Sequence, residues 1–182
     1  MLREAWDRHA EEWIAWARTP GHDSYWQFHR DAFLPLVPSP RRLTLDAGCG
    51  EGRVGRDLAT LGHRILGLDG SPTMARAASD HPESGGPCAI ADAAQLPVGD
   101  ATADLVVSFM ALQDVDAMDD AVAEMARVLE PGGRLILAIT HPASTTGRFA
   151  PPGTSRAGGS SSSGHGSTGP CCATRWRGVA SP

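Results

Sequence analysis

Residues 45–53 read LDAGCGEGR, a short apolar strand pattern that runs directly into a glycine-rich turn. Apolar residues then recur at helical spacing from Val54 to Leu61. The three glycines of the turn allow the backbone to approach a ligand closely, and the N-terminus of the following helix offers unpaired N–H groups. This segment therefore predicts a strand, a turn and a helix arranged around a bound small molecule.

The spacing of the glycines distinguishes between kinds of nucleotide-binding turn. A dinucleotide turn needs the pattern G-x-G-x-x-G, but the residue three positions after Gly50 is Arg53. A phosphate-binding P-loop needs a lysine, and all 16 basic residues of the chain are arginines. The sequence therefore excludes both of these nucleotide sites.

Short apolar runs alternate with helical patterns along most of the chain. The strand patterns cover residues 43–46, 64–69, 88–91, 104–110 and 135–140. Ser71 and Pro72 form a typical helix start, and residues 131–133, Pro-Gly-Gly, form a typical helix stop. This order predicts an α/β fold, a Rossmann-like doubly wound parallel sheet of about five strands with helices on both faces.

The composition divides the chain into three segments. Residues 1–40 carry an amphipathic helix with Trp6 and Trp13 on its apolar side, and they predict an N-terminal helical lid. Residues 41–142 contain the alternating pattern and predict the core domain. In residues 151–182, Gly, Ser and Pro fill 18 of 32 positions without a strand or helix period, so residues 143–182 are predicted to form a disordered tail.

Four motifs in order give the chain a family resemblance. They are Asp-x-Gly-x-Gly-x-Gly at 46–52, GLDGS at 67–71, ADAAQLP at 91–97 and RVLEPGG at 127–133. From about Thr44 to Pro142 the chain thereby resembles class I S-adenosylmethionine-dependent methyltransferases of the small-molecule type. The resemblance implies an enzyme that transfers a methyl group from S-adenosylmethionine to a small-molecule acceptor.

The C-terminal segment departs from this family. Its members follow the fifth strand with a helix and an antiparallel pair of strands, whereas residues 143–182 show no apolar run of strand length. We therefore expect the last antiparallel strands to be missing and the edge of the fifth strand to be unpaired. A shifted reading frame and a shortened natural variant both explain such a C-terminally truncated or altered chain. The alternative function is then a cofactor-binding fragment or pseudoenzyme without turnover.

The resemblance also implies roles for the motif residues. Asp69 would bind both ribose hydroxyls, and either Asp92 or the backbone of Ala93 would meet the adenine amino group. Asp46 would hold the turn or the cofactor's ammonium group. Arg53 would either reach the cofactor's carboxylate or, as we expect, lie solvated on its helix. The full predicted cofactor set is Asp46, Gly48, Cys49, Gly50, Gly52, Arg53, Asp69, Gly70, Met74, Asp92, Ala93, Leu96 and Phe109.

The resemblance fixes no catalytic residue. The sulfonium donor is already activated, so positioning supplies most of the catalysis, and a base is needed only for an acceptor that arrives protonated. Candidates are Asp114, His141 and Tyr25, for each of which a surface or capping role is the competing interpretation. The cysteines at 49, 88, 171 and 172 lack the paired spacing of a metal site, so no metal is expected.

Charge and hydropathy narrow the range of partners. The formal net charge of −5 disfavours binding to nucleic-acid phosphates or to an anionic membrane. The apolar runs are far shorter than the roughly 20 residues of a membrane span, and no apolar leader follows Met1. We therefore expect a cytoplasmic protein that acts on a small-molecule acceptor, with no nucleic acid and no membrane as partner. The oligomeric state is left open.

Overall fold

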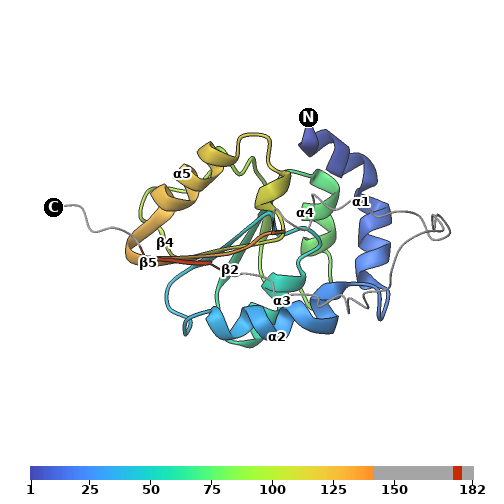
Figure 1. Cartoon of the computed structure of the whole chain (residues 1–182), viewed down its shortest axis with the longest axis horizontal. Coiled ribbons are helices and arrows are strands. Elements are labelled where there is room, and N and C mark those ends of the chain that lie inside the picture. Colours follow the sequence, from blue (N-terminus) through green and yellow to red (C-terminus); the bar gives the residue numbers. More distant parts are fainter. Residues whose placement is uncertain (142–173, 178–182) are drawn as a thin grey trace, which may run out of the picture.

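The computed structural model describes residues 1–141 and the backbone of residues 174–177. Its strands form one sheet in the order β3-β2-β1-β4-β5-β6 (Figure 1). Neighbouring strands from β3 to β5 are parallel, which confirms the predicted doubly wound sheet. The strands are β1 (Thr44–Ala47), β2 (Ile65–Asp69), β3 (Cys88–Ile90), β4 (Ala103–Phe109), β5 (Leu129–Ala138) and β6 (Thr174–Arg177).

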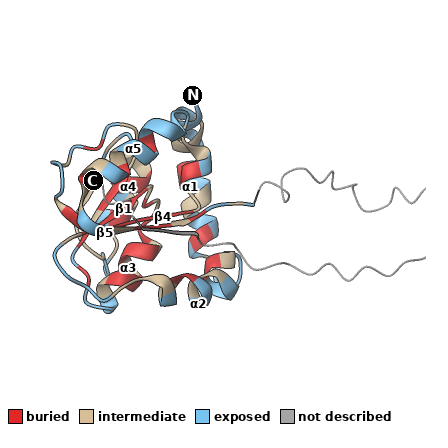
Figure 2. Ribbon diagram, turned by 60° about the vertical axis from the view of Figure 1, so that its left-hand side comes forward, coloured by how far each residue is buried: buried red, intermediate tan, exposed pale blue. Residues whose placement is uncertain are grey.

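Helices cover both faces of the sheet, as predicted. On one face, α5 (Met118–Val128) packs its buried side chains in one cluster with Leu45, Leu68 and Val106 of β1, β2 and β4. On the other face, α3 (Arg53–Thr60) and α2 (Arg30–Phe33) pack in a second cluster with Leu105, Val107 and Phe109 of β4 and with Ile65 and Ile136. Figure 2 shows that the buried residues gather in the strands and in the helix turns that face them. All seven residues of β4 are buried, as expected for a central parallel strand.

The predicted helix start at Ser71 is confirmed. Helix α4 (Pro72–Ser79) begins with proline, and the Ser71 hydroxyl oxygen accepts a hydrogen bond from the Met74 N–H at 3.2 Å. This N-cap satisfies one of the backbone donors at the start of the helix. The cap matters for the site because it fixes the chain immediately after β2.

The N-terminal segment is helical and lies beside the edge of the core. Helix α1 (Leu2–Arg18) runs along α4 (Figure 1). A π-helical turn, η1 (Tyr25–His29), then leads into α2 and a 3₁₀ turn, η2 (Leu34–Leu36). The aromatic residues of this segment reach the core through Tyr25 and Phe33, both of which contact Phe109 of β4.

The fifth strand differs from its predicted bounds. It begins at Leu129, directly after α5, and passes through the Pro-Gly-Gly segment that was predicted only to stop the helix. A register shift accommodates the glycines, because Ala103 pairs with Leu129 while Leu105 pairs with Arg134. Gly132 takes a positive φ of +80° within this bulge. The Pro-Gly-Gly segment thus marks an irregularity within the strand and not its boundary.

The expectation that the edge of β5 is unpaired is wrong, because one antiparallel strand lies beside it. Strand β6 pairs antiparallel with β5, with Leu135 opposite Trp176 and Ile136 opposite Arg175. The expectation relied on the lack of an apolar run in residues 143–182. A short edge strand needs no such run, because it pairs with its neighbour through main-chain N–H and C=O groups. The rest of the segment 143–182, for which disorder was predicted, lies outside the described residues.

Candidate functional site

A cavity of about 620 Å³ lies at the carboxyl edge of the parallel strands, which is where open α/β sheets bind ligands. Its volume is within the range of about 300–1000 Å³ that is usual for small-molecule sites. The cavity is lined by every residue of the predicted cofactor set except Gly52. Residues of the first three motifs therefore meet Phe109 around one space, although Phe109 is 63 positions from Asp46.

The three glycines of the turn are needed for different reasons. Gly48, Gly50 and Gly52 all have positive φ angles, of +76°, +55° and +88°. A Cβ on Gly48 would lie 2.4 Å from the Cβ of Ala111, whereas a Cβ on Gly50 would meet no atom within 4 Å. Gly52 is the N-cap of α3 and packs closely on Ala78, so its role is to seat the turn against α4.

Asp69 links the end of β2 to the glycine turn. Its Oδ2 accepts the Gly50 N–H and its Oδ1 accepts the Ser71 N–H, both at 2.8 Å. Each carboxylate oxygen keeps a further lone pair, so both oxygens can still accept a ligand hydroxyl. Burial raises the pKa of Asp69, and the two backbone hydrogen bonds act in the opposite direction. The residue is thus held rigidly at the cavity wall.

Asp46 lies buried beneath the turn. Among the described residues, its Oδ2 is one of two buried side-chain oxygens that accept no hydrogen bond, the other being Ser108 Oγ. Burial, with smaller contributions from Cys88 and Asp69, raises the pKa of Asp46 to about 7. A buried carboxylate oxygen without a hydrogen bond in a cavity wall is costly to the fold and is suited to a cationic or hydrogen-bond-donating ligand.

This raised pKa predicts a pH dependence of stability. The unfolded chain ionises Asp46 near pH 3.9, so the folded state loses stability as the pH rises from about 4 to about 7. In thermal melts without ligand, Asp46→Asn should therefore gain stability relative to the wild type as the pH rises, by at most about 4 kcal/mol. The exposed control Asp119→Asn should show no such trend. A constant difference between Asp46→Asn and wild type across this range would contradict the prediction.

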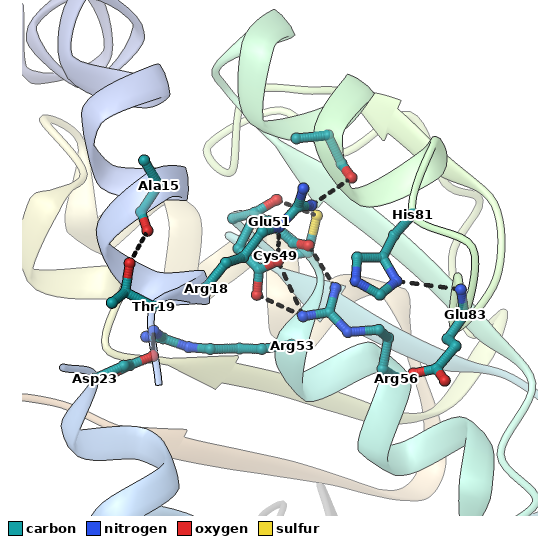
Figure 3. Close-up of polar contacts among 12 residues, drawn as sticks. Ala15, Arg18, Thr19, Asp23, Cys49, Glu51, Arg53, Arg56, His81 and Glu83 are labelled. Carbon is teal, nitrogen blue, oxygen red and sulfur yellow. Dashed lines mark hydrogen bonds and ion pairs between the residues drawn. The ribbon is translucent and has the colours of Figure 1, made fainter. Parts of the chain in front are cut away.

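Arg53 is not the solvated surface residue that we expected. Its side chain is only 13% exposed and forms an ion pair with Asp23 (Figure 3). Its guanidinium also lies 5.6 Å, 5.3 Å and 5.7 Å from the ring centres of Trp13, Tyr25 and Phe109. Asp23, Trp13 and Tyr25, which surround the guanidinium, all belong to the N-terminal segment. The helical pattern around Arg53 cannot reveal these distant contacts.

Sequence reasoning missed Glu51, which lines the cavity and joins three elements. Its buried carboxylate accepts hydrogen bonds from Arg18 Nε at 2.9 Å and from Arg56 Nη2 at 2.7 Å (Figure 3). Arg18 also donates to the Ala77 carbonyl at 2.9 Å. The cluster therefore clamps α1 to the glycine turn and to α4. Nothing in the local sequence connects Arg18 with a turn 33 positions away.

The first half of α1 lies over the cavity. The Leu2 N–H donates to Asp116 at 2.9 Å, and Arg3 Nε donates to the Gly70 carbonyl at 3.0 Å. Trp6 and Trp13, whose rings meet edge to face at 5.6 Å between centres, form part of the cavity wall. Helix α1 thus covers the carboxyl edge of the sheet with two tryptophans, beside the charged side chains of Arg3 and Glu4.

Of the three catalytic candidates, the structure brings only Asp114 to the cavity. Asp114 lies in η3 (Leu112–Asp114) and burial raises its pKa. Tyr25 is buried away from the cavity lining, and its hydroxyl donates to Asp57 at 2.7 Å. Burial and this carboxylate raise the pKa of Tyr25. His141 is exposed beyond β5 and does not line the cavity.

Among the described residues, no three His, Cys, Asp or Glu side chains lie together so that they could hold a metal ion. No helix in this part of the chain has the length and apolar character needed to cross a membrane.

The sequence profile of the methyltransferase domain family matches residues 45–137. The malonyl-acyl-carrier-protein O-methyltransferase of Enterobacter lignolyticus is 35% identical over 125 residues, which cover 65% of this chain and 47% of that protein. The demethylmenaquinone methyltransferase of Mycolicibacterium vanbaalenii is 36% identical over 119 residues, covering 64% and 49%. The chain thus spans about half the length of these curated relatives.

Solved structures share the fold. The S-adenosylmethionine-dependent methyltransferase of Mesorhizobium loti is 30% identical with a TM-score of 0.55, covering 62% of this chain and 52% of that one. The PH0226 protein of Pyrococcus horikoshii is 25% identical with a TM-score of 0.62, covering 71% and 61%. The profile match extends over just over half of the chain and includes the glycine turn, Asp69 and the parallel core. The chain therefore belongs to the class I S-adenosylmethionine-dependent methyltransferase family.

Proposed function

We propose that this chain binds S-adenosylmethionine and transfers its methyl group to a small-molecule acceptor. The observation that carries the proposal is the pairing of Asp69 with the glycine turn. One carboxylate, held by Gly50 and Ser71, keeps acceptor capacity on both oxygens at the wall of a cavity that the turn also lines. Two adjacent ribose hydroxyls have the donor pattern that such a carboxylate accepts.

The remaining cavity residues fit the other parts of the cofactor. Asp46 Oδ2, buried and without a hydrogen bond, is an acceptor for the methionine ammonium group. Met74 and Leu96 offer buried apolar surfaces to a purine ring. Asp92 accepts the Ala94 N–H at 2.9 Å through one oxygen, which leaves its other oxygen for the adenine amino group. When bound, S-adenosylmethionine supplies a methyl group on a sulfonium, a donor that needs no further activation.

We assign residues 1–40 the role of a lid that positions both reactants and excludes water. Helix α1 covers the cavity with Trp6 and Trp13, and the Glu51 cluster attaches the lid to the turn. Excluding water and holding the acceptor in line with the methyl group provide most of the acceleration for this reaction class. Asp114 is the residue that accepts a proton when the acceptor arrives protonated.

The names of the relatives support an organic acceptor. One is named for a malonyl group on acyl-carrier protein and another for demethylmenaquinone. A cavity lined by two tryptophans, Phe109 and Met110 beside Asp114 suits an acceptor with an apolar body and one polar group. The alternative of a cofactor-binding chain without turnover predicts the same cofactor affinity with no product.

Calorimetric titration with S-adenosylmethionine, its demethylated product and NAD tests the proposal. We expect both sulfur ligands to bind at least about 100-fold more tightly than NAD, because Arg53 stands where a dinucleotide turn needs its third glycine. NAD binding of equal or greater strength would overturn the proposal. A screen of acceptors with isotope-labelled methyl donor then separates an enzyme from a chain that only binds.

A further inference from the structure

Two cysteines meet beneath the cofactor turn, although they are 39 positions apart. Cys49 lies in the turn after β1, and Cys88 is the first residue of β3, paired with Gly67 of the intervening strand β2. Gly67 has no side chain, and the sulfurs occupy the space beside it. A Cβ placed on Gly67 would lie 2.8 Å from Cys88 Sγ and 3.0 Å from Cys49 Sγ. The separation of the two sulfurs therefore cannot exceed the sum of these distances.

The two thiols are chemically unequal. Cys88 is half-buried, and a hydrogen bond from Cys49 lowers its pKa, helped by the backbone at Gly67. Cys49 is buried, and the same hydrogen bond together with burial raises its pKa. The more exposed of two neighbouring thiols is suited to attack an oxidant, and the buried one is suited to resolve the product. The proposed methyl transfer uses neither sulfur.

We propose that Cys49 and Cys88 form a redox modification site that hydrogen peroxide converts to a disulfide, and that this bond distorts the cofactor turn. The Cys88 thiolate attacks one peroxide oxygen, so that an S–O bond forms, the O–O bond breaks and hydroxide leaves. Cys49 then attacks the sulfenic sulfur, so that the S–S bond forms and water leaves with the thiol proton. The sulfurs are oxidised and the peroxide is reduced.

The disulfide affects the cofactor site through the turn. An S–S bond of about 2 Å requires the Cys49 and Cys88 sulfurs to approach each other, which draws the turn toward β3. That movement disturbs the hydrogen bond from Gly50 to Asp69, which is 2.8 Å long in the thiol form. Oxidation should therefore weaken cofactor binding, and by linkage bound cofactor should disfavour the disulfide at equilibrium by the same factor. This consequence rests on the proposed function.

The test uses the full chain with Cys171→Ser and Cys172→Ser, which leaves only the two thiols of interest. After treatment with hydrogen peroxide, intact mass and peptide mapping should show a Cys49–Cys88 link and the loss of two hydrogens, both reversed by dithiothreitol. Calorimetry should show S-adenosylmethionine affinity about tenfold lower in the oxidised form. In a redox buffer of oxidised and reduced dithiothreitol, saturating S-adenosylmethionine should lower the linked fraction of the chain at equilibrium.

Single variants separate the two roles. In Cys49→Ser, whose hydroxyl can still donate a hydrogen bond to Cys88, Cys88 should stop at sulfenic acid, which dimedone traps. In Cys88→Ser, Cys49 should stay unmodified. Peroxide treatment that leaves the two cysteines unlinked would overturn the proposal, as would a link that leaves the affinity unchanged. A reduced chain that binds no S-adenosylmethionine would instead contradict the proposed function, and the mass measurement would still decide whether the thiols form a pair.

Discussion

Replacing Asp69 with alanine should weaken S-adenosylmethionine binding by about 100-fold. The change removes two charge-assisted acceptors, each worth about 1.5 kcal/mol or more, and every 1.4 kcal/mol corresponds to a factor of ten in affinity. It also leaves the N–H groups of Gly50 and Ser71 without the acceptor that now orients the turn. Calorimetric titration of the purified variant measures the loss directly.

A matched control distinguishes a local effect from a general one. Asp119→Ala removes an exposed carboxylate from the first turn of α5 that does not itself line the cavity, and it should leave the affinity within about twofold of wild type. Asp69→Asn keeps the size of the side chain but turns one acceptor into a donor facing a backbone N–H, so it should bind nearly as weakly as Asp69→Ala. If Asp69→Asn bound S-adenosylmethionine with wild-type affinity, the Asp69 carboxylate would not be part of the cofactor site.

The core of the fold could be predicted because its signals are local. Ser71-Pro72 predicts a helix start because the Ser71 hydroxyl caps the N–H of Met74, only three positions away. The apolar runs indicate which segments are buried as parallel strands. The position of the cavity followed from the same logic, since parallel strands end at a common edge. The glycine turn and Asp69 therefore met in space as the family resemblance implied.

The parts that sequence reasoning missed depend on pairs that are far apart in the chain. Arg53 is buried because Asp23 and Trp13 reach it from the N-terminal segment, and Glu51 is satisfied by Arg18 across 33 positions. Neither pair has a period or a spacing that a single sequence reveals. The same limit applies to β6, whose pairing with β5 uses main-chain groups that every residue carries.

Gly48→Ala should destabilise the fold by about 3 kcal/mol and abolish tight cofactor binding. The new Cβ would lie 2.4 Å from the Cβ of Ala111, and alanine would have to adopt a φ of +76°. Both costs act at the point where the turn passes the end of β4. Urea unfolding measures the stability, and calorimetry measures the binding.

Two further variants separate the clash from the backbone strain. Gly50→Ala meets no atom within 4 Å and has a φ of +55°, so it should cost only about 1 kcal/mol. The double variant Gly48→Ala/Ala111→Gly removes the contact and retains the positive φ, so it should recover about half of the stability that Gly48→Ala loses. If Ala111→Gly gave no recovery, the close approach of the turn to η3 would not be the reason that position 48 requires glycine. If Gly50→Ala cost as much as Gly48→Ala, backbone strain alone would explain both positions.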